Sequence, residues 1–163
     1  MLGFLKVFLA MALITVYACG VLGDPLNGRW AGKDQNGAEI EMRFNNGKLE
    51  TSTNGHLFMK GTYTTNNGEL LQKITHFNGK GASAVFEGAM VFEERWYPAD
   101  EFLVAFRNEF RKLPRQGMPE RIFEEQMNQL VNGFASMASM PPAPYSIDGK
   151  KLTLANGTVL HRR

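Results

Sequence analysis

The sequence predicts a mainly β protein: an eight-stranded antiparallel meander closed into a barrel, with a two-helix insertion before the last strands. The first observation is a recurring Asn-Gly dipeptide, which favours tight hairpin turns because both residues tolerate positive φ. It occurs at 27–28, 36–37, 46–47, 54–55, 67–68, 78–79, 132–133 and 156–157. The second is an alternation of apolar and polar residues between these turns. A barrel follows because an open sheet of short strands would leave two unpaired edges and a bare apolar face.

The alternation is clearest from Ala38 to Phe44, where Ile40, Met42 and Phe44 share one face and charged residues occupy the other. This pattern is typical of an antiparallel strand with one buried and one wetted side. Further strands are predicted over 48–53, 56–65, 69–78 and 82–93, and after the helices over 145–147, 151–155 and 158–162. Within 82–93 the prediction rests on alternating apolar residues that include Phe86 and Met90.

The periodicity becomes helical in an insert at about 98–140. Apolar residues recur at helical spacing from Asp100 to Leu113, and Pro114 ends this first helix. A second helix begins at Pro119 and ends before the proline-rich run at 141–144. So long an insert within a meander is either a lid or contact surface, or it packs on the barrel and plugs one end.

Composition and motifs exclude several classes of function. The 163 residues include 18 basic and 16 acidic side chains, and no run of Lys or Arg predicts a nucleic-acid partner. The single cysteine excludes an internal disulfide and a cysteine-clustered metal site. His56, His76 and His161 have no metal-ligand spacing, and nucleophile elbows and phosphate-binding loops are lacking from the sequence. We therefore expect no catalytic residue, metal or cofactor, and a protein that is not an enzyme.

The N-terminus predicts export. A positive start precedes an apolar run from Val7 to Tyr17 and then small residues, the pattern of a signal peptide. The stretch Val16-Tyr17-Ala18-Cys19 resembles the lipobox of bacterial lipoproteins. That resemblance implies a signal peptide over 1–18, a membrane anchor through a diacylated Cys19, a tether over 19–26 and a barrel over 27–163. The expected location is the cell envelope, and Gly20 after the cysteine favours the outer membrane. The alternatives are a periplasmic or secreted protein cut after Gly20 or Gly23, or an uncleaved anchor.

Gly28-Arg29-Trp30 opens the first strand and matches the Gly-x-Trp signature of lipocalins and bacterial lipocalin-like domains. The similar bacterial domains also repeat phrases such as 44–48 (Phe-Asn-Asn-Gly-Lys) and 60–63 (Lys-Gly-Thr-Tyr). The resemblance covers 25–92 and 145–163 and leaves out the helical insert. It implies a calycin-type barrel in which Gly28 and Trp30 are the structural signature. It also implies that a basic residue of the last strand packs over Trp30, with Arg162 as the candidate and Arg163 as the alternative.

The barrel interior is the remaining candidate site. The residues expected to point inward and contact a ligand are Ile40, Met42, Phe44, Met59, Tyr63, Phe86 and Met90. A cavity lined in this way would take a small hydrophobic or amphipathic molecule, with Tyr63 as its polar handle. The same side chains would equally suit a filled core. Two functions follow: an envelope protein that binds a ligand in its barrel, or an envelope lipoprotein whose filled barrel displays the helical insert to a protein partner.

Overall fold

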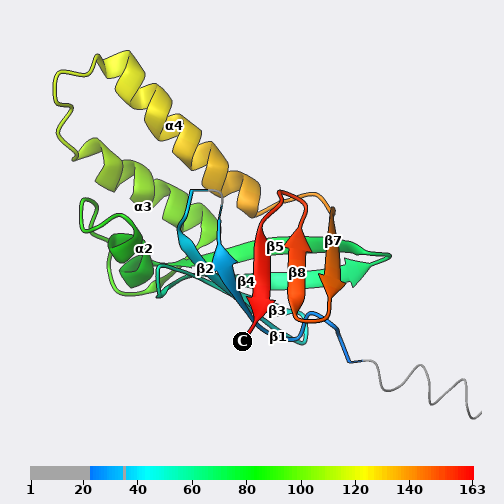
Figure 1. Cartoon of the computed structure of the whole chain (residues 1–163). Coiled ribbons are helices and arrows are strands. Elements are labelled where there is room, and N and C mark those ends of the chain that lie inside the picture. Colours follow the sequence, from blue (N-terminus) through cyan, green and yellow to red (C-terminus); the bar gives the residue numbers. More distant parts are fainter. Residues whose placement is uncertain (1–22, 35) are drawn as a thin grey trace, which may run out of the picture.

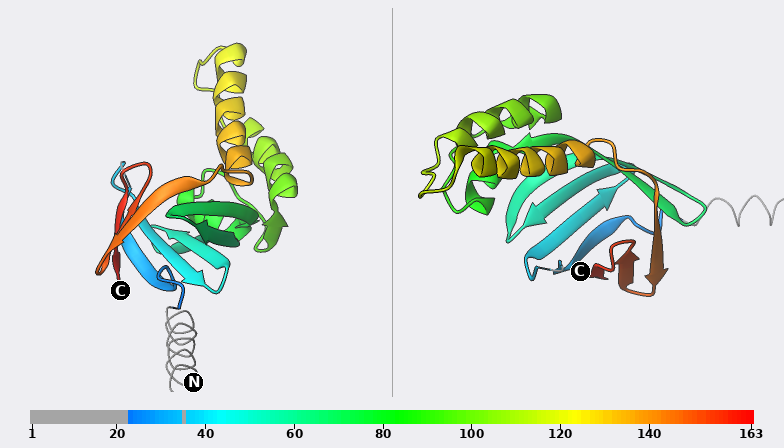
Figure 2. Two further views of the ribbon diagram at one scale, coloured as in Figure 1. Left: turned by 90° about the vertical axis from the view of Figure 1, so that its right-hand side faces the viewer. Right: turned by 90° about the horizontal axis from the view of Figure 1, so that it is seen from above.

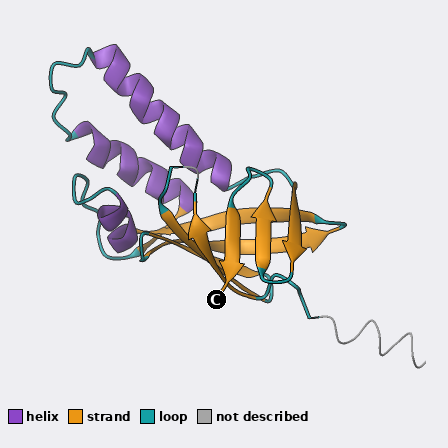
Figure 3. Ribbon diagram, in the orientation of Figure 1, coloured by secondary structure: helices purple, strands orange, loops and turns teal. Residues whose placement is uncertain are grey.

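The computed structural model describes residues 23–34 and 36–163. The described chain holds nine strands and three helices (Figures 1 and 3). In chain order these are β1 (Gly28–Lys33), β2 (Glu39–Asn45), β3 (Lys48–Thr53), β4 (His56–Asn66), β5 (Glu69–Asn78), α2 (Gly79–Val85), β6 (Trp96–Pro98), α3 (Ala99–Arg111), α4 (Glu120–Met137), β7 (Ala143–Asp148), β8 (Lys151–Leu154) and β9 (Val159–Arg162).

Eight of the strands form a closed antiparallel ring. Their order is β4-β3-β2-β1-β9-β8-β7-β5, and β5 pairs in turn with β4. The first strand therefore lies beside the last, with Trp30 opposite Arg162. Among the described residues, the short strand β6 pairs only with β5, and it stands outside the ring. The predicted fold class is confirmed: a mainly β protein whose eight-stranded meander barrel carries its helices between β5 and β7.

Three Asn-Gly turns hold the β2–β5 meander in register. Asn46, Asn54 and Asn67 have φ of 46°, 49° and 49°, and the glycine after each also has a positive φ. This succession of two left-handed residues is what a two-residue type I′ hairpin requires. Lys48, His56 and Glu69 consequently pair with the last residue of the preceding strand.

The prediction of a strand over 82–93 is wrong. Asn78 does not open a hairpin turn; its side chain accepts a hydrogen bond from the Gly81 N–H at 2.9 Å and caps α2. The Ser83 hydroxyl of α2 accepts a hydrogen bond from the Phe92 N–H at 2.9 Å and so fixes the loop that follows the helix. Asn-Gly serves both a hairpin and a helix start, because the Asn side chain competes locally for backbone donors. The alternating apolar residues of 82–93 therefore belong to a helix and the loop that follows it.

The helices share one hydrophobic core with the barrel. Phe102 of α3 stacks on Phe77 of β5 with ring centroids 4.4 Å apart, and Phe134 of α4 meets Phe77 edge-on at 5.6 Å. Phe58 of β4 lies in contact with Phe77, at 5.6 Å. Figure 2 shows the helices gathered at one end of the barrel, with the α3–α4 hairpin extending beyond it. The apolar stripes of the two helices thus bury partly against the sheet, through Phe102 and Phe134, and partly against each other, where the ring centroids of Phe110 and Phe123 lie 4.9 Å apart.

Candidate functional site

One end of the barrel is closed by its N-terminal segment. Trp30 is fully buried, and its indole Nε1 donates a hydrogen bond to the Leu26 carbonyl at 2.7 Å. The Arg162 guanidinium lies 4.5 Å from the centre of the Trp30 ring and donates to the Pro25 carbonyl at 2.5 Å. Arg162 thus occupies the place for which the resemblance to lipocalins implies a basic residue. These contacts join β1 and β9 to the chain segment that precedes the barrel.

Tyr63 serves the same closure. Its buried hydroxyl donates a hydrogen bond to the Asp24 carboxylate and lies 3.0 Å from Asn27 Oδ1. Burial, followed by the hydrogen bond to Asp24, raises the pKa of Tyr63 to about 12. Tyr63 was expected to offer a polar handle to a ligand in the barrel. Its hydroxyl instead holds residues 24–27 across the barrel end.

The raised pKa of Tyr63 makes a prediction for alkaline stability. The folded state favours the neutral phenol, so this contribution is complete below the ordinary pKa of about 10 and is lost as pH rises through about 12. Tyr63→Phe has no phenol to ionise at this position, so the variant does not undergo this alkaline destabilisation. We therefore expect the difference in free energy of unfolding between wild type and variant to shrink by about 1–2 kcal/mol between pH 8 and pH 11.5. Urea unfolding of wild type and variant at both pH values measures the change. An unchanged difference would contradict the linkage.

The remaining residues of the expected ligand set divide into two groups. Met42 and Phe44 are buried inside the barrel, where Phe44 packs edge-on against Tyr63 at 4.9 Å. Ile40 and Met59 are half-buried and pack against the same core. Phe86 and Met90 lie in the loop region after α2 rather than on a barrel strand, and Phe86 packs on Phe106 of α3 at 5.6 Å. The residues expected to contact a ligand are therefore divided: Ile40, Met42, Phe44 and Met59 belong to the barrel, and Phe86 and Met90 belong to its helical end.

The barrel is weakly joined at one place, the junction of β5 and β7, here called the seam. β4 and β5 pair at eight positions, whereas β5 and β7 pair only through Glu69 with Pro144 and Leu70 with Ala143. Proline has no N–H to donate to a ladder, and three prolines stand at positions 141, 142 and 144. Residues 71–74 of β5 consequently pair with β4 alone within the described chain.

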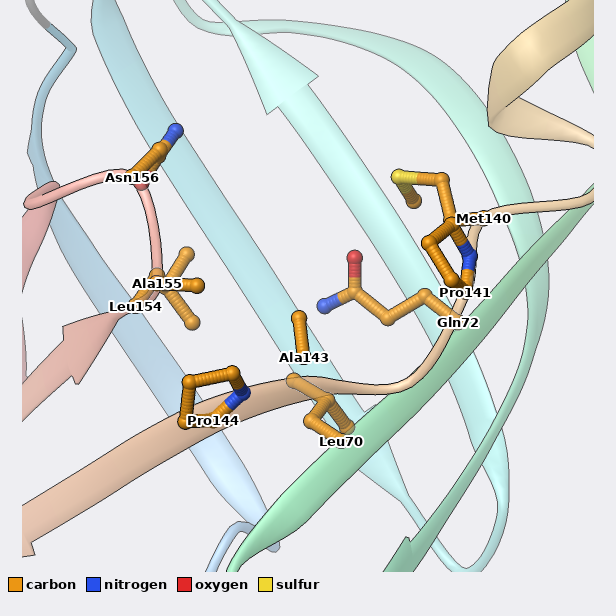
Figure 4. A pocket seen from close by; sticks show the side chains of 9 residues that line it. All are labelled: Leu70, Gln72, Met140, Pro141, Ala143, Pro144, Leu154, Ala155 and Asn156. Carbon is orange, nitrogen blue, oxygen red and sulfur yellow. The ribbon is translucent and has the colours of Figure 1, made fainter.

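A cavity of about 190 Å³ opens at the seam (Figure 4). Its walls come from β5, from the linker between α4 and β7, from the first residues of β7, and from β8 with the turn after it. The nine lining residues are Leu70, Gln72, Met140, Pro141, Ala143, Pro144, Leu154, Ala155 and Asn156. All nine are uncharged, and only two of them carry polar side chains. Sequence analysis missed this site because the proline run was interpreted only as the end of a helix.

The two polar side chains of the cavity differ in their availability. Asn156 accepts a hydrogen bond from the Thr158 N–H at 3.0 Å, as part of the β8–β9 turn. Gln72 alternates in phase with the buried Leu70 and Ile74, and Figure 4 shows its amide extending into the cavity. The backbone N–H and C=O of Gln72 also point toward the seam. In an antiparallel strand these groups point to the same edge at every second residue, and the Gly68 carbonyl, four residues earlier, accepts a hydrogen bond from the Tyr145 N–H of β7 at 3.1 Å.

Comparisons of the chain with protein-family models, with curated proteins and with solved structures find no match. The geometry alone establishes a closed eight-stranded antiparallel barrel, consistent with a calycin-type fold. Cys19 and the signal segment 1–18 lie outside the described residues. Across residues 23–34 and 36–163, no cluster of His, Cys, Asp and Glu could hold a metal ion. In that same part of the chain, no helix is long and apolar enough to cross a membrane.

Proposed function

We propose that this protein is exported to the cell envelope, anchored there through Cys19, and binds a small hydrophobic or amphipathic molecule at the seam. The observation that carries the binding function is an apolar cavity at the least paired junction of an otherwise closed barrel. Export and anchoring are supported by the signal pattern of residues 1–18 and by the lipobox resemblance. Two acyl chains would hold the protein on a membrane, since each buried methylene contributes about 0.8 kcal/mol.

The size of the cavity limits what it holds. A cavity of about 150 Å³ accepts benzene, and sites for drug-sized ligands span roughly 300–1,000 Å³. The seam cavity, at about 190 Å³, therefore accommodates one ring or a short stretch of alkyl chain. The rest of a longer ligand would lie along the open seam. Each buried methylene of such a ligand contributes about 0.8 kcal/mol before the cost of immobilisation.

The centre of the barrel is a poorer candidate than the seam. Trp30, Phe44 and Leu160 are 0%, 1% and 0% exposed, and they occupy strands on the side of the ring away from the seam. The helical end is filled by the cluster around Phe102 and Phe134. The ligand set expected from the sequence thus contributes mainly to packing, and the proposed ligand contacts are those of the seam.

Filling the seam cavity is expected to abolish binding. Ala155 is exposed and lines the cavity, so Ala155→Trp places an indole in its mouth with little disturbance of the core. We expect at least about a tenfold loss of affinity for octan-1-ol, followed by NMR amide shifts, because the ligand would have to displace the indole. The matched control is Ala89→Trp, another exposed alanine, which lines a separate groove beside the α3–α4 turn. Equal binding by wild type and Ala155→Trp would refute the proposed site.

Export and anchoring are tested on the protein purified from its native envelope. Intact-mass analysis is expected to find residues 1–18 removed and two acyl chains plus a glyceryl group on Cys19. Cys19→Ser, which cannot form the thioether, is expected to leave the signal uncleaved and the mass unacylated. A mature chain that begins after Gly20 or Gly23 lacks Cys19, so this result would contradict anchoring and indicate a secreted protein. The same spectra, recorded under native conditions, report any molecule retained at the seam.

A further inference from the structure

We infer that the seam selects ligands whose buried end carries an uncharged hydrogen-bonding group, such as an alcohol, amide or ester, and that Gln72 is the residue that makes this selection. The inference rests on the proposed binding function of the same cavity and names its ligand class. Carboxylates, phosphates and ammonium groups are the classes it excludes.

The first argument is the charge of the walls. Every residue that lines the cavity is neutral, including those contributed by the linker and by β8. The charged residues nearest to Gln72 along β5 are Glu69 and Lys73, and both are exposed. Their odd positions place them on the opposite face of the strand from Leu70 and Gln72. A ligand charge buried at the seam would therefore have no counter-ion among the cavity walls, and an unpaired buried charge is costly.

The second argument is the state of the Gln72 amide. Within the described part of the chain its side chain has no hydrogen-bond partner, and its amide points into the cavity (Figure 4). A primary amide offers two donor hydrogens and an acceptor oxygen, so it can pair with a hydroxyl, an amide or an ester. Its backbone N–H and C=O, at the unpaired edge of β5, add one donor and one acceptor beside it. The other polar side chain of the cavity, Asn156, accepts from the Thr158 N–H, so Gln72 is the neutral group that can both donate to and accept from a ligand.

Three ligands with the same eight-carbon chain separate charge from hydrophobicity. We expect octan-1-ol and octanamide to bind wild-type protein at neutral pH, and octanoate to bind at least about tenfold more weakly. Affinities are obtained from NMR amide shifts of residues that line the seam, which also report where each ligand binds. Octanoate binding as tightly as the neutral ligands would overturn the inference and leave the proposed function standing. Failure of all three ligands to shift these residues would overturn the proposed function itself.

A charge introduced at residue 72 tests the assignment of selectivity to that side chain. Gln72→Lys supplies the missing counter-ion, so we expect the order of affinities to reverse, with octanoate gaining at least about tenfold. Gln129→Lys, on the exposed surface of α4, makes the same change of net charge away from the seam and is expected to leave the order unchanged. Reversal in both variants would mean that overall charge, and not Gln72, sets the preference. An unchanged order in Gln72→Lys would likewise overturn the role of this residue.

Discussion

Replacing Trp30 with alanine is expected to lower the free energy of unfolding by about 3–5 kcal/mol. The indole is fully buried, and its removal leaves a cavity beneath the Arg162 guanidinium, which now stacks on the ring at 4.5 Å. It also removes the donor to the Leu26 carbonyl, which holds the N-terminal segment across the barrel end. Urea unfolding followed by circular dichroism measures the change.

Trp96→Ala is the matched control for this experiment. Trp96 is half-buried in the short strand β6, outside the closed ring, and its ring lies under the Lys60 ammonium at 4.4 Å. Its loss removes less buried surface, so we expect a destabilisation of about 1–2 kcal/mol. Equal effects of the two substitutions would contradict the idea that the Trp30 region is the structural closure of the barrel.

Phe102→Ala is expected to destabilise the whole barrel by a similar amount, about 3–5 kcal/mol, although Phe102 belongs to the helical insert. Its ring is fully buried and stacks on Phe77 of β5 at 4.4 Å. Because the helices and strands share this core, we expect one cooperative transition and a parallel loss of hydrogen-exchange protection in β4 and β5. Val104→Ala on the same helix is the control; Val104 is 60% exposed, and its replacement should change stability by no more than about 0.5 kcal/mol.

The shared core changes how the helical insert should be studied. Deleting residues 98–140 would uncover Phe58 and Phe77, which α3 and α4 cover, so the barrel would not remain folded as a control. The hypothesis that the insert binds a protein partner is better tested with substitutions of exposed residues such as Val104 and Leu130. A separate unfolding transition for the helices in wild-type protein would contradict the single core and make deletion informative.

Several parts of the fold could be predicted because their causes are local. The Asn-Gly dipeptides at Asn46, Asn54 and Asn67 favour left-handed backbone, and a hairpin turn forms at each of them. The two helices were predicted because a 3.6-residue apolar period and flanking prolines mark them within the sequence itself. Asn78-Gly79 was the exception, because one dipeptide serves both a hairpin and a helix cap, and the choice between them depends on later residues such as Ser83.

The sequence by itself determined the eight strands of the ring, the three hairpin turns of the β2–β5 meander and the two helices α3 and α4, since each depends on residues close together in the chain. Only the tertiary structure decided where the ring is weakly joined and what lines that junction. A proline run is visible in the sequence, but its consequence arises because Pro141, Pro142 and Pro144 arrive beside β5, about seventy positions earlier, and have no N–H to donate to it. The alternation of apolar and polar residues indicates which face of β5 Gln72 occupies. Only the tertiary structure shows that, among the described residues, β7 pairs with β5 at Glu69 and Leu70 alone and leaves the seam edge of Gln72 unpaired.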